Sequence, residues 1–94
     1  MIQLKEGYTI LTKQHCKWCE KVKELLPDAH FIPCDIPPAP SKVRDDFFTN
    51  VDDLSGAQPR TFPMVFYNKK YIGGYVDTKK WLEDMTLTFD TNNF

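Results

Sequence analysis

The sequence predicts an α/β fold in which a four-stranded mixed sheet carries three helices on both of its faces. Short runs rich in β-branched and aromatic residues alternate with segments of helical spacing. The last two of these runs are separated by a short polar turn, which predicts a hairpin. The expected order of elements is therefore β-α-β-α-β-β-α, and alternating strands and helices followed by a hairpin place helices on both faces of the sheet.

Length and composition predict one globular domain over residues 1–94. The chain is 41% hydrophobic and 14% aromatic, which is enough apolar material for a single core without a metal or disulfide staple. A net charge of −1 argues against non-specific binding to nucleic acid or to an anionic membrane. No apolar run approaches the roughly 20 residues of a membrane span. Residues 1–6 lack the apolar region of a secretory signal, and an odd number of cysteines, three, fits a disulfide framework poorly. We therefore expect the protein to reside in the reducing environment of the cytoplasm.

The first half of the chain predicts a strand, a helix and a second strand. Residues 8–12 form the first strand, and residues 16–26 form a helix that Pro27 brings to an end. Residues 30–36 are expected to form the second strand. Because Pro33 has no N–H to donate, part of this strand should lie at an edge of the sheet.

The second half predicts a helix, a hairpin and a final helix. Ser41 is expected to cap the second helix, whose apolar face comprises Val43, Phe47, Val51 and Leu54. The opposite, solvated face of this helix comprises Lys42, Arg44, Asp45 and Asp46. Residues 63–67 and 70–72 should pair as the hairpin. Asp77 or Thr78 is expected to cap the third helix, which should fray over residues 86–94. This layout is that of a minimal thioredoxin-like fold.

A Cys-x-x-Cys pair stands at the start of the first predicted helix, directly after the first strand. The N-terminus of a helix carries partial positive charge and free N–H groups, so a thiol placed there loses its proton more easily. The thiolate is the nucleophile in disulfide exchange. We therefore expect Cys16 to attack, aided by the charges of Lys13, His15 and Lys17. Cys19, one turn further in and on the apolar face, is expected to be the shielded resolving thiol.

A structural zinc site is the alternative interpretation of the cysteines. The spacing of Cys16, Cys19, His30 and Cys34 approaches that of a site with three thiolates and one imidazole. Pro33 prevents His30 and Cys34 from sharing a helical face, and the chain has enough apolar material to fold without metal. We therefore expect no metal site, and we expect Cys34 to be a small core residue.

Three separated motifs resemble those of the glutaredoxin family, and the resemblance covers nearly the whole chain. They are Lys13-x-x-Cys16-x-x-Cys19, Thr61-Phe62-Pro63 and Gly73-Gly74-Tyr75-Val76-Asp77. A Cys-x-x-Cys pair alone is weak evidence, whereas all three motifs in this order, each at the end of the expected element, are strong. In that family the proline of the second motif is cis and faces the redox pair, so the resemblance implies a cis bond before Pro63.

The resemblance also implies a binding site for glutathione. Lys13, with Arg60, would meet the glycyl carboxylate, and the backbone of Phe62 would pair with the cysteinyl unit. The amides of Val76 and Asp77 would hold the γ-glutamyl carboxylate, as a helix N-terminus holds an anion. The carboxylate of Asp77 would meet the ammonium group. Trp18, which stands where the family usually has tyrosine, would form a wall of the groove.

The activity implied by the resemblance is glutathione-dependent thiol–disulfide oxidoreduction by a monomer that uses the Cys16/Cys19 pair. Its partners would be glutathione and disulfide-containing or glutathionylated proteins, ribonucleotide reductase among them. Two alternatives stay open. One is a thioredoxin-like electron carrier that a reductase reduces in place of glutathione. The other is a dimer that binds a [2Fe–2S] cluster through Cys16 and glutathione, as some family members without the active-site proline do; Lys17 replaces that proline here.

Overall fold

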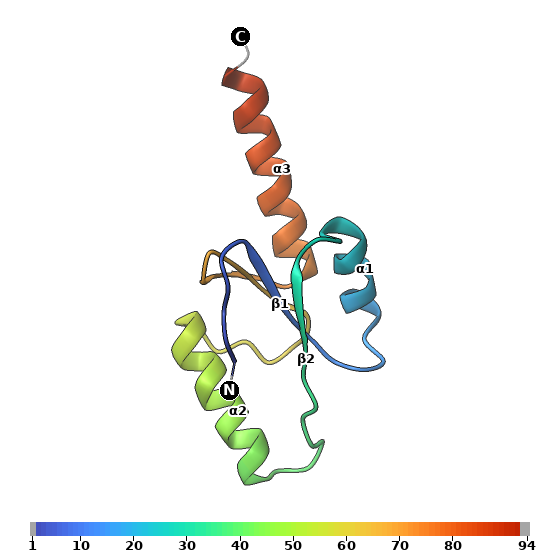
Figure 1. Cartoon of the computed structure of the whole chain (residues 1–94), viewed down its shortest axis with the longest axis vertical. Helices are drawn as coiled ribbons and strands as arrows, with labels where there is room; N and C mark the ends of the chain where they lie inside the picture. Colours follow the sequence, from blue (N-terminus) through green and yellow to red (C-terminus); the bar gives the residue numbers. More distant parts are fainter. Residues whose placement is uncertain (1, 93–94) are drawn as a thin grey trace.

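The computed structural model describes residues 2–92, with side chains placed for residues 2–85. Four strands and three helices follow one another in the predicted order (Figure 1). Their bounds are β1 Tyr8–Thr12, α1 Lys17–Leu25, β2 His30–Pro33, α2 Lys42–Ser55, β3 Met64–Tyr67, β4 Lys70–Gly73 and α3 Tyr75–Asn92. The predicted α/β class and thioredoxin-like layout are confirmed.

The strands form one mixed sheet in the order β2-β1-β3-β4. Strand β1 pairs in parallel with β2 and antiparallel with β3, and β3 pairs antiparallel with β4. Strand β2 lies at an edge, as the missing N–H of Pro33 predicted. It ends at Pro33, so it is shorter than the predicted segment 30–36. The hairpin turn at Asn68 and Lys69 has two positive φ angles, 47° and 71°, a geometry that matches the twist of the paired strands.

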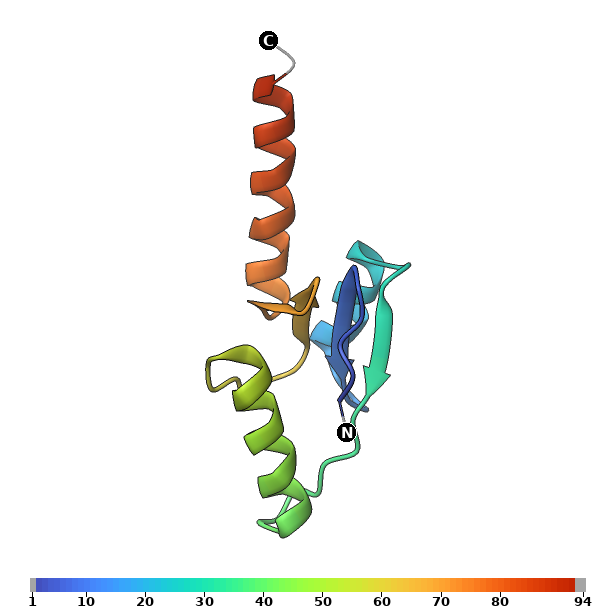
Figure 2. The same ribbon diagram turned by 60° about the vertical axis from the view of Figure 1, so that its left-hand side comes forward.

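Helices cover both faces of the sheet, and the alternation of side chains along the strands assigns residues to each face. Leu11 belongs to a buried cluster that packs with α2, whereas its neighbour Ile10 packs with Val22 of α1. Tyr75, at the start of α3, joins the cluster on the α1 side. Figures 1 and 2 show α2 apart from α1 and α3, with the strands between them.

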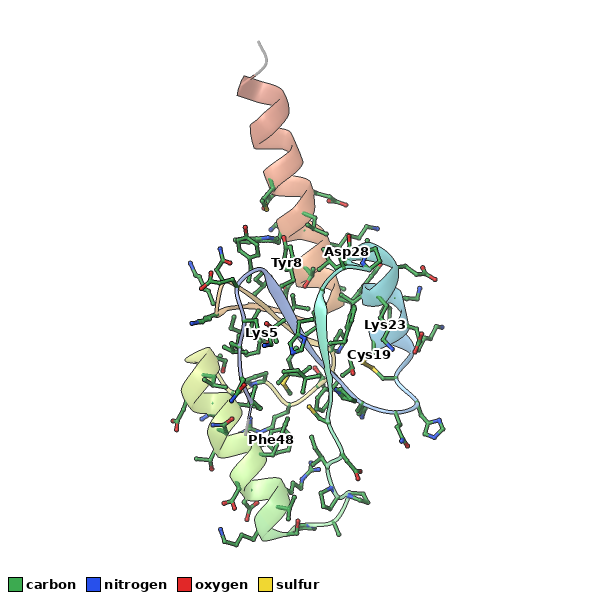
Figure 3. All side chains as sticks on the ribbon, viewed as in Figure 1. Lys5, Tyr8, Cys19, Lys23, Asp28 and Phe48 are labelled. Atoms are coloured by element: carbon green, nitrogen blue, oxygen red, sulfur yellow. A yellow bond between two sulfur atoms is a disulfide. The ribbon has the colours of Figure 1, made fainter. Side chains whose placement is uncertain are left out.

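Helix α2 packs on the core with most of its predicted apolar face, and one predicted residue is exposed. Its cap is as predicted, because the Ser41 hydroxyl accepts a hydrogen bond from the Arg44 N–H at 3.2 Å. Of the predicted face, Val51 is buried and Phe47 and Leu54 pack against the core, whereas Val43 is 61% exposed. Phe48, which was not predicted, is also buried. Phe48 is labelled in Figure 3, where its side chain extends from α2 toward the strands. Arg44, predicted to be solvated, is half-buried.

Helix α3 begins at Tyr75, so the predicted cap at Asp77 or Thr78 is wrong: both residues lie inside the first turn. The Thr78 N–H donates to the carbonyl oxygen of Gly74 at 3.0 Å, so the first turn of the helix starts there. The helix continues to Asn92, beyond the point where fraying was expected, and projects away from the sheet (Figures 1 and 2). Residues 93–94 lie outside the described part. None of the helices in that part has the length and apolar character to cross a membrane.

Candidate active site

The two cysteines of the Cys-x-x-Cys pair are joined by a disulfide at the first turn of α1. Cys16 is the N-cap residue, and its sulfur accepts a hydrogen bond from the backbone N–H of Cys19 at 3.1 Å. A sulfur in this position lies at the positive end of the helix dipole and satisfies one of the free N–H groups. Both effects favour the thiolate over the thiol when the disulfide is reduced.

The two sulfur atoms differ in access to solvent. Cys16 is partly exposed, whereas Cys19 is 1% exposed and lies on the buried face of α1 with Val22. Figure 3 shows Cys19 on the inner side of α1, next to the sulfur–sulfur bond. The geometry therefore suits an attacking Cys16 and a shielded Cys19, the roles that the sequence predicted.

Trp18 lies on the side of the redox pair where α1 meets α3. Its ring is 5.4 Å from that of Tyr75, centroid to centroid, and the ammonium of Lys21 lies 5.1 Å from the Trp18 ring. Trp18 is 48% exposed and does not line the groove that contains Lys13. Tyr75 was not predicted as a site residue, because its contact with Trp18 arises only when α1 and α3 pack together.

A groove of about 540 Å³ runs from the loop before α1, past the end of β2, to α2. Of the predicted site residues it contains Lys13, Arg60 and Phe62, with the Lys13 ammonium 5.7 Å from the centre of the Phe62 ring. Two other residues that line the groove, Arg44 and Phe48, were not predicted as site residues. The two aromatic rings give the groove apolar walls, and the three cations favour an anionic ligand.

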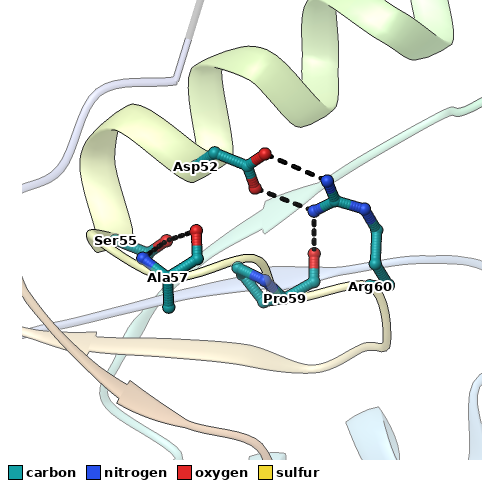
Figure 4. A network of polar contacts seen from close by, with 5 residues as sticks. All are labelled: Asp52, Ser55, Ala57, Pro59 and Arg60. Carbon is teal, nitrogen blue, oxygen red and sulfur yellow. Dashed lines mark hydrogen bonds and ion pairs between the residues drawn. The ribbon is translucent and has the colours of Figure 1, made fainter.

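Arg60 lies at the α2 wall of the groove and is bound to Asp52 (Figure 4). Its Nη1 and Nη2 donate to the two carboxylate oxygens of Asp52 at 2.8 and 3.0 Å. Nη1 also donates to the carbonyl oxygen of Pro59 at 2.8 Å. The hydrogen bonds between the two side chains lower the pKa of Asp52 and raise that of Arg60, so both groups are charged at neutral pH.

The peptide bond between Phe62 and Pro63 is cis, as the resemblance implied. Pro63 is buried, and its carbonyl oxygen lies close to the start of α3, because a Cβ built on Gly74 would be 3.6 Å from it. The turn at Phe62 and Pro63 therefore lies between the groove and the N-terminus of α3, with Phe62 in the groove and Pro63 beside Gly74.

Val76 and Asp77 stand on the first turn of α3, where the resemblance places the γ-glutamyl end of glutathione. Val76 is 72% exposed. The Asp77 carboxyl group packs against Gly73, whose φ of 142° suits glycine, and a Cβ at that position would overlap it. Asp77 also lines a separate cavity of about 300 Å³ with Tyr71. Burial of Tyr71, together with the negative charge of Asp77, raises the pKa of the tyrosine hydroxyl. In this structure the Asp77 side chain thus faces the β3–β4 hairpin, outside the groove of Lys13.

Cys34 lies at the end of β2 and lines the same groove as Lys13. It was expected to be a small core residue; it is only partly buried, although it packs against the core cluster, and burial raises the pKa of its thiol to about 11. The four residues of the zinc alternative are not brought together, since the described residues include no group of three or more His, Cys, Asp or Glu side chains placed to hold a metal ion.

No family profile and no curated protein sequence matches the chain. Solved structures do match it. Glutaredoxin 1 from Francisella tularensis, crystallised with cacodylate, aligns with a TM-score of 0.63 at 19% identity over 85% of this chain and 95% of that one. A buckwheat glutaredoxin–glutathione complex aligns with a TM-score of 0.62 at 24% identity over 87% and 73% of the two chains. Reduced Escherichia coli glutaredoxin aligns with a TM-score of 0.56 at 21% identity over 83% and 94%.

These similarities establish the fold, and the redox pair adds chemical information that the fold alone does not carry. A disulfide at the first turn of a helix, with one accessible and one buried sulfur, supports thiol–disulfide oxidoreduction. The chain therefore has the thioredoxin-like fold of the glutaredoxins and carries a Cys16–Cys19 redox pair at the first turn of α1.

Proposed function

We propose that this protein is a dithiol glutaredoxin, an enzyme that uses glutathione to reduce mixed disulfides and protein disulfides. The observation that carries the proposal is the Cys16 sulfur at the N-cap of α1, hydrogen-bonded to the Cys19 N–H, with Cys19 buried behind it. The solved complex of the buckwheat glutaredoxin with glutathione supports glutathione as the ligand of this fold.

The reaction on a glutathione mixed disulfide needs only Cys16. Its thiolate attacks the glutathione sulfur, the bond to the substrate sulfur breaks, and the substrate leaves as a thiolate that takes up a proton. A second glutathione thiolate then attacks the glutathionyl sulfur on Cys16. This step releases glutathione disulfide and restores the Cys16 thiolate, so the two electrons gained by the substrate come from glutathione.

The reaction on a protein disulfide needs both cysteines. Cys16 attacks one substrate sulfur and forms a mixed disulfide with the substrate, and the other substrate sulfur leaves as a thiolate. Cys19 then attacks the sulfur of Cys16, which releases the reduced substrate and leaves the Cys16–Cys19 disulfide seen here. Two glutathione molecules reduce this disulfide and leave as glutathione disulfide. Disulfide-containing and glutathionylated proteins of the cytoplasm, ribonucleotide reductase among them, are the proposed substrates of a monomeric enzyme.

The proposed contacts with glutathione lie on both sides of the turn at Phe62 and Pro63. Lys13, beside Phe62 in the groove, would bind the glycyl carboxylate. The backbone of Phe62 would pair with the cysteinyl unit, and the free N–H groups of Val76 and Asp77 would receive the γ-glutamyl carboxylate. Asp77 would meet the ammonium group only after its carboxylate turns from the hairpin toward the ligand, whereas Trp18 would cover the site from the α1 side.

Turnover of a small glutathione mixed disulfide with glutathione, glutathione reductase and NADPH tests the proposal. A parallel reaction replaces glutathione and its reductase with thioredoxin reductase. Turnover with glutathione alone supports a glutaredoxin. Turnover with thioredoxin reductase alone would support the electron-carrier alternative, and a visible absorption band in anaerobically purified protein would support the [2Fe–2S] alternative.

A second test concerns the start of α3. If the N-terminus of α3 binds the γ-glutamyl end, Asp77→Ala should raise the KM for a glutathione mixed disulfide while kcat changes little, because the Cys16 chemistry is untouched. Asp84→Ala, on the same helix and further from its N-terminus, serves as the control. An unchanged KM in the Asp77 variant would remove this contact from the proposed site.

A further inference from the structure

A second groove, also of about 540 Å³, adjoins the groove beside Lys13 and shares residues 33–35 with it. Its walls are residues 32–35, at the end of β2, and one face of residues 43–53 of α2; Ile2, in the segment before β1, also lines it. Figures 1 and 2 show this segment between α2 and β2. This second groove is named the α2–β2 trough, and the proposed redox chemistry gives it no role.

The floor of the α2–β2 trough is apolar and rests on the core. Ile2, Ile32 and Phe47 are half-buried and pack against the buried cluster beneath α2. Val43, one turn before Phe47 on the same face of the helix, lines the trough and is 61% exposed. Because the core holds the floor in place, the trough exists without a ligand. An exposed apolar side chain that continues such a floor indicates a surface for a partner.

The rim of the trough is acidic. Asp35, Asp46 and Asp53 line it, and its described lining residues include no lysine, arginine or histidine. Asp46 pairs with Lys42 at 2.8 Å, whereas the ion pairs among the described residues do not include Asp35 or Asp53. The trough is therefore negatively charged. The groove beside Lys13 has the opposite sign, since three cations and one carboxylate line it.

The sign of this charge selects the class of ligand. Glutathione at neutral pH carries two carboxylates and one ammonium group, so the acidic rim disfavours it, and it disfavours nucleic acid for the same reason. A polypeptide segment in which apolar side chains are flanked by lysine or arginine matches both features of the trough. Its apolar side chains cover the floor, and its cations meet the carboxylates of the rim.

The trough is connected to the redox pair through the residues that it shares with the other groove. Residues 33–35 line both, and Gln14, two residues before Cys16, lines the groove beside Lys13. A polypeptide that leaves the trough across residues 33–35 therefore enters the groove that leads toward Cys16. A small mixed disulfide bound at Cys16 does not extend as far as the trough, whereas a protein substrate can occupy both grooves together.

We propose that the α2–β2 trough binds a segment of the protein substrate in which apolar side chains are flanked by lysine or arginine. This inference rests on the proposed function and names a class of protein substrate for it. The trough takes no part in the exchange chemistry. It holds the substrate at a second place, so it lowers the KM for protein disulfides that carry such a segment and has no effect on small mixed disulfides.

Binding of synthetic peptides tests the trough without any redox step. One probe is a capped peptide with leucine and tryptophan between two lysines, and the other has glutamate in place of both lysines. NMR titration of the isotope-labelled, oxidised full chain measures both dissociation constants, and the amides of residues 32–35 and 43–53 should shift. The lysine peptide should bind about tenfold more tightly at low salt, and the difference should shrink as salt screens the charges.

Two variants with matched controls test the floor and the rim. Val43→Ser should weaken binding of the lysine peptide by about tenfold, because it removes an apolar contact. Its control is Met85→Ser, which changes an exposed apolar residue on α3 outside the trough. Asp53→Asn should weaken binding by about twofold to fivefold, the range for an exposed ion pair. Asp45→Asn, on the same helix and outside the trough lining, is its control. Both controls should bind as the wild type does.

Reversal of one rim charge gives a stricter test. Asp53→Lys should lose affinity for the lysine peptide and gain affinity for the glutamate peptide, each by about twofold to fivefold. A substitution that merely disturbed the structure would lower the affinity for both peptides. Circular dichroism of each variant checks that the fold is kept.

Kinetic measurements test the link between the trough and the redox pair. Each of the two segments is joined, through flexible spacers of several lengths, to a peptide that contains an intramolecular disulfide. Turnover with glutathione, glutathione reductase and NADPH should show a lower KM for the lysine substrate at spacer lengths that reach from the trough to Cys16. The kcat should be the same for both substrates. Val43→Ser should remove this KM difference and leave turnover of a small glutathione mixed disulfide unchanged.

Three outcomes would overturn the assignment. Equal affinity for the two peptides, or shifts confined to residues outside the trough, would exclude a basic, apolar segment as its ligand. Binding in the trough with equal KM values at every spacer length would exclude the substrate as its occupant. A dimer in sedimentation experiments that Val43→Ser dissociates would assign the trough to a second copy of the chain. Absence of turnover with every disulfide, small ones included, would instead refute the proposed function, while the titrations would still decide whether the trough binds the lysine peptide.

Discussion

Two thiols in this protein come after neighbouring parallel strands and yet have opposite surroundings. Cys16 comes shortly after β1, and Cys34 comes directly after β2, the strand that pairs with β1. The Cys34 N–H donates to the carbonyl oxygen of Thr12, the last residue of β1, at 2.7 Å. Both thiols therefore stand at the same edge of the sheet, where the carboxyl ends of parallel strands meet.

The segment on the C-terminal side of each cysteine decides the chemistry of its thiol. Cys16 leads into α1, so its sulfur is partly exposed and accepts a backbone N–H from the first turn. Cys34 leads into a proline-rich segment without a helix, and its thiol, which donates to the carbonyl oxygen of Ile32 at 3.5 Å, is half-buried. Burial raises the pKa of the Cys34 thiol to about 11. A helix N-terminus thus favours the thiolate at one site, while burial favours the thiol at the other.

The largest effect is expected from removing the thiol at the helix N-terminus. Cys16→Ser should abolish turnover of both mixed disulfides and protein disulfides, since a serine hydroxyl at this position cannot take its place in disulfide exchange. Turnover with glutathione and glutathione reductase measures the loss, and Cys34→Ser is the matched control. Residual activity in the Cys16 variant that a further Cys34→Ser change removes would show that Cys34 is reactive, contrary to the contrast between the two thiols.

A smaller, selective effect is expected at the buried partner of Cys16. Cys19→Ser should keep turnover of a small glutathione mixed disulfide and lose turnover of a protein disulfide, because only the second reaction needs an intramolecular attack on Cys16. Assays of both substrates on the same preparation measure this split. Loss of both activities in a folded variant would refute the assigned roles of the two cysteines.

The element order and the redox pair could be predicted because local residues determine them. The cap at Ser41, the edge position of β2 and the first turn at Cys16 each depend on one residue and its immediate neighbours. The cis bond at Pro63 was correct through the resemblance alone, since no local property of Phe62 and Pro63 requires it.

The groove could not be predicted because packing determines it. Phe47 and Phe48 are adjacent on α2, and both contact the core. The sequence pattern predicted Phe47, which packs on the core, but it did not predict Phe48, which is buried more deeply and lines the groove with Arg44. The pairing of Arg60 with Asp52 joins a loop to a helix and leaves no periodic signal in the sequence. The early start of α3 likewise depends on the backbone geometry at Gly73.

The reactivity of the two thiols toward an alkylating reagent measures their difference directly. In reduced protein treated with iodoacetamide, Cys16 should react quickly at pH 7. A pKa of about 11 leaves a Cys34 thiolate fraction on the order of 10⁻³ at pH 8, so Cys34 should react far more slowly. Its rate should rise about tenfold per pH unit up to the pKa. Mass spectrometry of the alkylated peptides measures both rates, and a Cys34 rate that is already constant above pH 8 would contradict the assigned burial.

The smallest effect is expected from replacing Cys34 itself. Cys34→Ser should leave turnover within about twofold of wild type and lower the free energy of unfolding by about 1 kcal/mol, since a hydroxyl replaces a half-buried thiol. In the folded protein the pKa of the Cys34 thiol is about 11, above the pKa of a thiol in the unfolded chain. The contribution of this thiol to the free energy of unfolding is therefore complete below the pKa of the unfolded state. It is lost as the pH rises through the pKa of the folded state. Serine does not titrate there, so the difference in unfolding free energy between wild type and variant should shrink as the pH rises toward 11. Urea titrations at neutral and alkaline pH measure this difference, and a constant value would mean that Cys34 titrates as an exposed thiol and that the contrast with Cys16 depends on the helix alone.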